Sequence, residues 1–101
     1  MAQLIYSKQA ITDLDRLTDF LLEADPASAP DTAALITEAI EVLANHPFIG
    51  RPAEEGLREL LISRGRSGYV ALYSYEEVED AVLLLAIRHQ REAGYPDGPD
   101  A

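Results

Sequence analysis

The spacing of apolar residues changes once along the chain, and this change constrains the fold more than any other feature. Up to Asn45, apolar side chains recur every three or four residues, over 8–24 and again from about Asp31. That spacing is typical of amphipathic helices. The expected apolar stripes are Ile11, Leu14, Leu17, Leu21 and Leu22 on the first helix and Leu35, Ile36, Ala39, Ile40 and Leu43 on the second, with Asp13, Asp15, Asp19 and Glu23 mostly outward. Beyond Gly56, runs rich in branched and aromatic residues cover 57–63, 69–75 and 81–89, as strands do. The sequence therefore predicts an α+β fold in which the helices precede most of the sheet.

Short connections decide how these elements are arranged. The six residues 25–30 join the two helices, so the helices fold back on each other as an antiparallel hairpin. The three later strands follow one another through short polar loops and form an antiparallel meander. Leu4 to Tyr6 form a short first strand, and Ser7 is a good N-cap for the first helix. We expect a single domain over 1–101, with the helical hairpin packed on one face of an antiparallel β-sheet.

Alternation along the strands makes both faces of this sheet apolar. One face is expected to hold Leu60, Ile62, Tyr69, Ala71, Tyr73, Val82, Leu84 and Ala86, and the other Leu61, Ser63, Val70, Leu72, Leu83, Leu85, Ile87 and His89. Two helices cover only one face, and large exposed apolar patches are uncommon on monomers. The second face is therefore covered by the chain itself, by a second copy, or by another protein.

Composition excludes several classes of site. The chain has no cysteine, which excludes disulfides, thiolate nucleophiles and cysteine-based zinc sites. His46 and His89 lie far apart in sequence, so we expect no metal and no other cofactor. No apolar run approaches the length of a membrane span and no signal-peptide pattern is present, so we expect a cytoplasmic protein without a membrane partner.

The formal net charge of −10 at pH 7 argues against nucleic acid as a direct ligand. Proteins that grip phosphates carry a basic footprint, and we expect no sequence-specific nucleic-acid binding by the chain alone. Arginines without lysines in the second half favour planar, bidentate contacts to carboxylates. An acidic protein segment is as plausible a ligand as RNA.

Polar side chains gather where the last strand ends. Val82 to Ile87 is apolar and runs directly into Arg88, His89, Arg91 and Tyr95. This is the part of the chain that most resembles a binding edge.

Three segments resemble the RelE/ParE family of toxins from type II toxin–antitoxin systems, most closely its ParE-like branch. These segments are 56–60, Gly65 to Tyr73 and Leu85 to Tyr95. The resemblance covers essentially the whole chain. It implies a growth inhibitor that is encoded on a plasmid or on a chromosome, and that in the first case would stabilise the plasmid. It also implies a cognate, ParD-like antitoxin that wraps the toxin and carries a DNA-binding domain.

The branches of this family differ in target. RelE-like members resemble ribosome-dependent mRNA endonucleases, whereas ParE-like members inhibit DNA gyrase without being enzymes. RNA cleavage needs a base, an acid and cations that stabilise the transition state. Aligned on Gly68, the positions that should be basic hold Leu61, Ser63 and Val70, so the resemblance favours gyrase inhibition. A RelE-like nuclease using His89 and Tyr95, or a toxin-fold module that has lost toxicity, are the alternatives.

We expect contacts with the target or the antitoxin from seven residues, with outer apolar helix positions adding to antitoxin docking. Surface arginines commonly pair with nearby acids instead, His89 follows a strand as boundary residues do, and Tyr69, Tyr73 and Tyr75 share a face as core residues would. The seven residues are Arg58, Arg64, Arg66, Arg88, His89, Arg91 and Tyr95.

Overall fold

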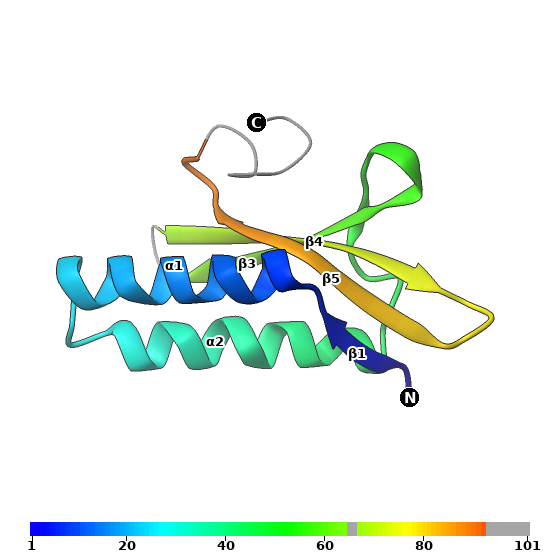
Figure 1. The fold of residues 1–101 in the computed structure, drawn as a ribbon, viewed down its shortest axis with the longest axis horizontal. Coiled ribbons are helices and arrows are strands. Elements are labelled where there is room, and N and C mark those ends of the chain that lie inside the picture. Colours follow the sequence, from blue (N-terminus) through cyan, green and yellow to red (C-terminus); the bar gives the residue numbers. More distant parts are fainter. Residues whose placement is uncertain (65–66, 93–101) are drawn as a thin grey trace.

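The computed structural model describes residues 1–64 and 67–92, and its elements follow the predicted order (Figure 1). Their bounds are β1 (Gln3–Tyr6), α1 (Lys8–Ala24), α2 (Ala29–Glu41), β2 (Arg51–Pro52), β3 (Arg58–Arg64), β4 (Ser67–Glu76) and β5 (Ala81–His89). Two single 3-10 turns, η1 (Val42–Ala44) and η2 (Glu54–Gly56), follow α2 and precede β3. Within the described ranges, no helix is long and apolar enough to cross a membrane.

The five strands form one sheet in the order β1-β5-β4-β3-β2. Strands β3, β4 and β5 make the predicted antiparallel meander. The expectation of a wholly antiparallel sheet was wrong at one edge, because β1 runs parallel to β5. Short connections set the direction of strands that follow one another, but both helices and strands β2, β3 and β4 lie between β1 and β5 in the chain. The short strand β2 was not predicted and pairs with β3 through two residues.

Helix α1 begins as the sequence predicts, because the Ser7 hydroxyl accepts a hydrogen bond from the N–H of Ala10 at 3.0 Å. Its buried line is Ala10, Asp13 and Leu17. The predicted core stripe was wrong at Ile11 and Leu22, which are both about half exposed. Ile11 follows Ala10 directly and so lies about 100° further around the helix.

Helix α2 lies beside α1, and both cover the same face of the sheet (Figure 1). Its predicted stripe is confirmed, since Ile36 and Ile40 are buried together with Leu43 of η1. These side chains share one core with Tyr69 and Tyr73 of the sheet. Tyr75, also predicted as core, is only partly buried against this cluster.

A bulge in β5 overturns part of the predicted face assignment. Tyr73 pairs with Leu84 and Leu72 pairs with Ala86, so Leu85 is an extra residue in the ladder. An extra residue reverses the alternation beyond it. Ile87 therefore lies in the core under the helices, whereas Ala86 belongs to the opposite face.

The face of the sheet away from the helices is partly covered by the chain itself. Val70, Leu72 and Ala86 are buried there, and Ala53 and Leu57 pack against them. In Figure 1 the green segment leading into β3 rises on this side of the sheet. Leu61 on the same face remains 46% exposed, so the coverage is incomplete.

Candidate interaction surface

The predicted polar cluster at the end of β5 is divided between the two faces of the sheet. Arg88 pairs with Val70 on the face away from the helices. His89 lies on the helix side, with its ring edge-to-face against Tyr69 at a centroid distance of 5.2 Å. The bulge at Leu85 causes this arrangement and corrects the predicted face of His89.

Arg88 braces the turn that follows β5. Its Nη1 donates to the backbone carbonyls of His89, Gln90 and Glu92, each at 3.3 Å. Nδ1 of His89 accepts a hydrogen bond from the backbone N–H of Arg91 at 3.1 Å, which also joins the end of β5 to the turn. The Arg91 side chain is exposed. The turn is thus a structured element that presents one exposed cation.

Arg58, the first residue of β3, holds a second loop, 45–50, which precedes β2. Its Nη1 donates to the carbonyls of Phe48 at 3.1 Å and Gly50 at 2.7 Å. Its guanidinium carbon lies 5.1 Å from the centroid of the Phe48 ring, within the range of a cation–π interaction. Arg58, predicted as a contact residue, therefore also fixes the shape of its neighbourhood.

Tyr73 holds the same loop from within the core. Its hydroxyl donates to the Pro47 carbonyl at 2.8 Å and accepts from the N–H of Gly50 at 2.9 Å. Burial raises the pKa of the Tyr73 phenol, outweighing the opposing effects of Gly50 and Arg58. A Cβ on Gly50 would lie 2.6 Å from this hydroxyl oxygen, so only glycine allows the close approach.

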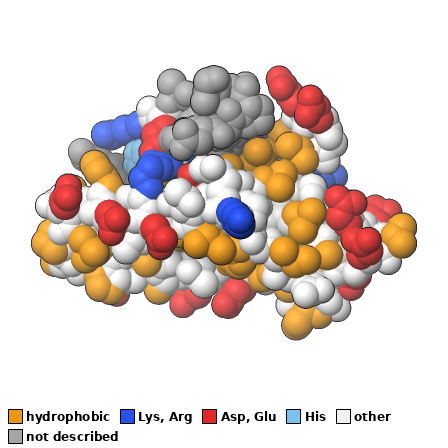
Figure 2. All heavy atoms as spheres, viewed as in Figure 1, with side chains coloured by type: hydrophobic (Ala, Val, Ile, Leu, Met, Phe, Trp, Pro, Cys, Tyr) orange, Lys and Arg blue, Asp and Glu red, His pale blue; other side chains and the backbone are white. Residues whose placement is uncertain are grey.

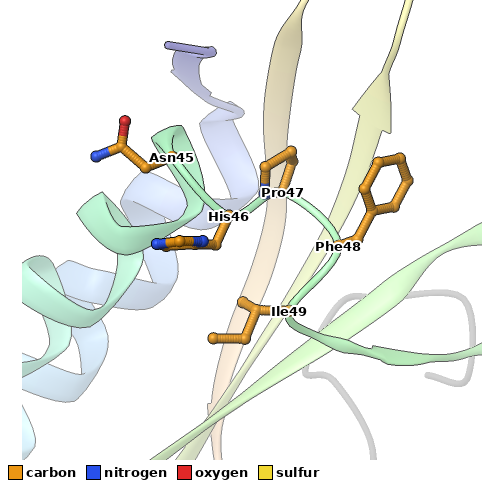
Figure 3. Close-up of a pocket in the computed structure, with 5 residues that line it drawn as sticks. All are labelled: Asn45, His46, Pro47, Phe48 and Ile49. Carbon is orange, nitrogen blue, oxygen red and sulfur yellow. The ribbon is translucent and has the colours of Figure 1, made fainter.

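This braced loop exposes two large apolar side chains, Phe48 at 54% and Ile49 at 58%. Residues 45–49 line an open hollow of about 400 Å³. Figure 3 shows His46 and Ile49 pointing to one side of the loop and Phe48 to the other. Sequence reasoning missed this surface, although two large apolar residues between Pro47 and Gly50 were a visible signal.

The wider surface is acidic with exposed apolar side chains between the acids. Figure 2 shows this mixture on the face that it draws. On the helices, Ile11, Phe20 and Leu22 are exposed. The sequence predicted docking by outer apolar helix positions without naming them, and these three exposed side chains occupy such positions in the structure, although Ile11 and Leu22 were predicted as core.

Three of the seven predicted contact residues are only partly placed or not placed. Arg64 is the last residue of β3, while Arg66 and Tyr95 lie outside the described residues. Arg58 and Arg88 bind different loops, and no direct contact brings them together in the described part of the chain. Within 1–64 and 67–92, no three acidic or histidine side chains are grouped as a metal site would need.

Comparison with known proteins decides the family. The family described as "ParE toxin of type II toxin-antitoxin system, parDE" matches residues 4–94. The chain belongs to this ParE toxin family. The predicted RelE/ParE resemblance is confirmed, including its ParE-like branch.

Relatives of this ParE-family chain include two toxins of Caulobacter vibrioides. Toxin RelE3 is 38% identical over 84 residues, which cover 83% of this chain and 89% of the relative. Toxin RelE2 is 34% identical over 89 residues, which cover 88% and 96%. Proteins similar to this chain therefore carry the RelE name, although the family that it matches is named ParE.

Solved structures agree on the ParE/RelE toxin fold. A chain of the chromosomal ParDE system from P. aeruginosa has a TM-score of 0.73 and 25% identity, covering 88% of this chain and 96% of that one. A chain of the RelBE2 toxin–antitoxin complex from Mycobacterium tuberculosis has a TM-score of 0.64 and 21% identity, covering 88% and 98%. The second likeness supports the fold alone.

Proposed function

We propose that this ParE-family toxin inhibits growth by binding DNA gyrase, and that a ParD-like, DNA-binding antitoxin neutralises it by forming a complex. The toxin would act in the cytoplasm. Support for the antitoxin comes from the family description and from the ParDE system of P. aeruginosa. The contact residues we propose are those predicted from the sequence, with Phe48 and Ile49 added.

The observation that supports inhibition by binding, as opposed to RNA cleavage, is the aliphatic nature of the sheet face beside Arg88. Leu61 of β3 pairs with Val70 of β4, and Val70 pairs with Arg88 of β5. A nuclease would need several cations here to stabilise a phosphorane, and losing one such donor costs about a hundredfold or more in rate. Two of these three neighbouring positions are aliphatic, and Arg88 donates to backbone carbonyls.

A supercoiling assay with purified gyrase tests the proposed target. The wild-type toxin is expected to arrest supercoiling and trap cleaved DNA, and the same toxin mixed with its antitoxin is expected to have no effect. No inhibition at stoichiometric excess would refute gyrase as the target.

A ribosome-dependent mRNA endonuclease is the second candidate, favoured by the RelE names of the Caulobacter relatives. Cleavage of mRNA on purified ribosomes by the wild-type chain, lost in a His89→Ala variant, would establish it. A third outcome, no growth defect when the chain is expressed without antitoxin, would identify a toxin-fold module that has lost toxicity.

A further inference from the structure

Where strand β1 ends, residues at the start of helix α1 and within it bond the edge of β5 in its place. Strand β1 pairs with β5 only as far as Leu84. Beyond it, the Ser7 hydroxyl donates to the Leu85 carbonyl at 3.0 Å and the Asp13 carboxylate accepts from the N–H of Ile87 at 2.8 Å. Arg16 completes this edge by donating from Nη2 to the Ile87 carbonyl at 3.3 Å.

Arg16 also reaches past the strand to the turn that follows it. Its two terminal nitrogens bond the two carboxylate oxygens of Glu92, one through an ion pair and the other at 3.3 Å. Both side chains are partly buried. A fork of this kind fixes orientation as well as distance, so α1 sets where the turn leaves the sheet.

Few other bonds hold this turn to the rest of the described chain. Gln90 donates its N–H to the Gly68 carbonyl at 2.9 Å, and Glu92 donates its N–H to the His89 carbonyl at 3.0 Å. The second of these bonds, and the three that Arg88 donates to the carbonyls of His89, Gln90 and Glu92, hold the turn to the end of β5 and not to the helices. The Arg16–Glu92 pair is therefore the described side-chain tie from the helices to the turn.

We propose that Arg16 and Glu92 form a latch through which α1 positions the turn and its exposed Arg91 for the antitoxin. Both are positioning residues, because they act through the turn. The partner chemistry that suits the Arg91 guanidinium group is a carboxylate-bearing segment of the antitoxin. This inference rests on the proposed function, since it assumes that the antitoxin contacts the turn.

The test compares Arg16→Met, Glu92→Gln and the double variant with wild type and with Arg51→Met. Arg51 forms an ion pair of similar kind with Glu59 at 3.2 Å on the opposite edge of the sheet, which makes it a matched control. Glu92→Gln keeps the side-chain shape, so it provides a folded variant if Arg16→Met destabilises the protein. The probe is the antitoxin encoded beside the toxin gene.

In the free toxin, we expect amide hydrogen exchange of Gln90 and Glu92 to accelerate about tenfold in both single latch variants. We expect the antitoxin to dissociate faster from both, with the double variant no worse than Arg16→Met alone, because Arg16 also bonds the Ile87 carbonyl and pairs with Asp13, and we expect Arg51→Met to match wild type. Unchanged exchange, or faster exchange with unchanged dissociation, would overturn the latch. Failure of the wild-type toxin to bind the antitoxin would instead refute the proposed partner, while the exchange rates still decide whether α1 holds the turn.

Discussion

The carboxylate of Asp13 accepts a hydrogen bond from the backbone N–H of Ile87, which lies 74 residues away in sequence. Asp13 is only 1% exposed, and its other oxygen accepts from the Gln9 side chain at 2.9 Å. An open strand edge would leave the Ile87 N–H without a partner. The helix therefore protects the part of β5 that β1 does not reach.

Replacing Asp13 with alanine should lower the free energy of unfolding by about 3 kcal/mol, because the Ile87 N–H then becomes a buried donor without its acceptor. Asp15 on the same helix is exposed, and Asp15→Ala should change stability by less than about 0.5 kcal/mol. Urea denaturation of the three proteins measures both values. Equal decreases in the free energy of unfolding for the two variants would show that the buried Asp13 hydrogen bond does not contribute to stability more than an exposed carboxylate does.

The N-cap of α1 has a second bond that an ordinary cap lacks. Ser7 caps Ala10 and also donates to Leu85 of the bulge. Ser7→Ala should therefore cost about 1–2 kcal/mol, at the upper end for an N-cap.

Ser28 is the control for the cap, because it precedes α2 without a side-chain cap bond and its hydroxyl donates instead to the exposed carboxylate of Asp25. Ser28→Ala should cost clearly less than Ser7→Ala in the same denaturation experiment. A similar cost at both positions would mean that the two Ser7 bonds contribute no more to stability than the exposed bond of Ser28 to Asp25.

Most of the fold was predictable because its signals are local. The period change and the short loops gave the order of elements, and α1 and β5 have the predicted bounds. The direction of β1 was not predictable, since no tight turn ties it to β5. The bulge at Leu85 was hidden for a different reason: Ala86 and Ile87 are both apolar, so exchanging their faces leaves no trace in the pattern.

The candidate surface was predictable in part. The sequence indicated Arg58 and Arg88, but their guanidinium groups bind carbonyls of loops whose shapes arise only in the folded chain. Asp13 was assigned to the outer side of its helix, because a buried carboxylate depends on a distant backbone N–H that the sequence does not reveal. Phe48 resembles any loop residue until the contacts of Tyr73 and Arg58 are known.

Gly50 should not tolerate a side chain. A Cβ there would meet the Tyr73 ring at 2.7 Å and the Glu59 carbonyl at 2.9 Å, so Gly50→Ala should cost about 2–3 kcal/mol through overpacking. Gly56 has open space but a φ of 77°, and Gly56→Ala should cost only about 1 kcal/mol. Thermal or urea unfolding ranks the two variants, and the reverse order would refute the close approach.

Alkaline pH should destabilise the protein through Tyr73. Burial raises the pKa of its phenol above the ordinary value of 10.0, so the folded state holds this proton more tightly than the unfolded state. The stabilising contribution is complete below pH 10 and is lost as pH rises through the raised folded pKa, because the unfolded state ionises first.

The variant Tyr73→Phe separates this effect from that of other tyrosines. The pKa of Tyr6 is raised by burial and by the charge of Glu41, and that of Tyr75 by its hydrogen bond to Asp80, so some decline should remain. Tyr73→Phe should lower the free energy of unfolding by about 1–3 kcal/mol at pH 7, since Pro47 and Gly50 lose their partner. Between pH 9 and 11 it should decline less steeply than wild type in urea denaturation. Identical slopes would show that the Tyr73 proton is not held by the fold.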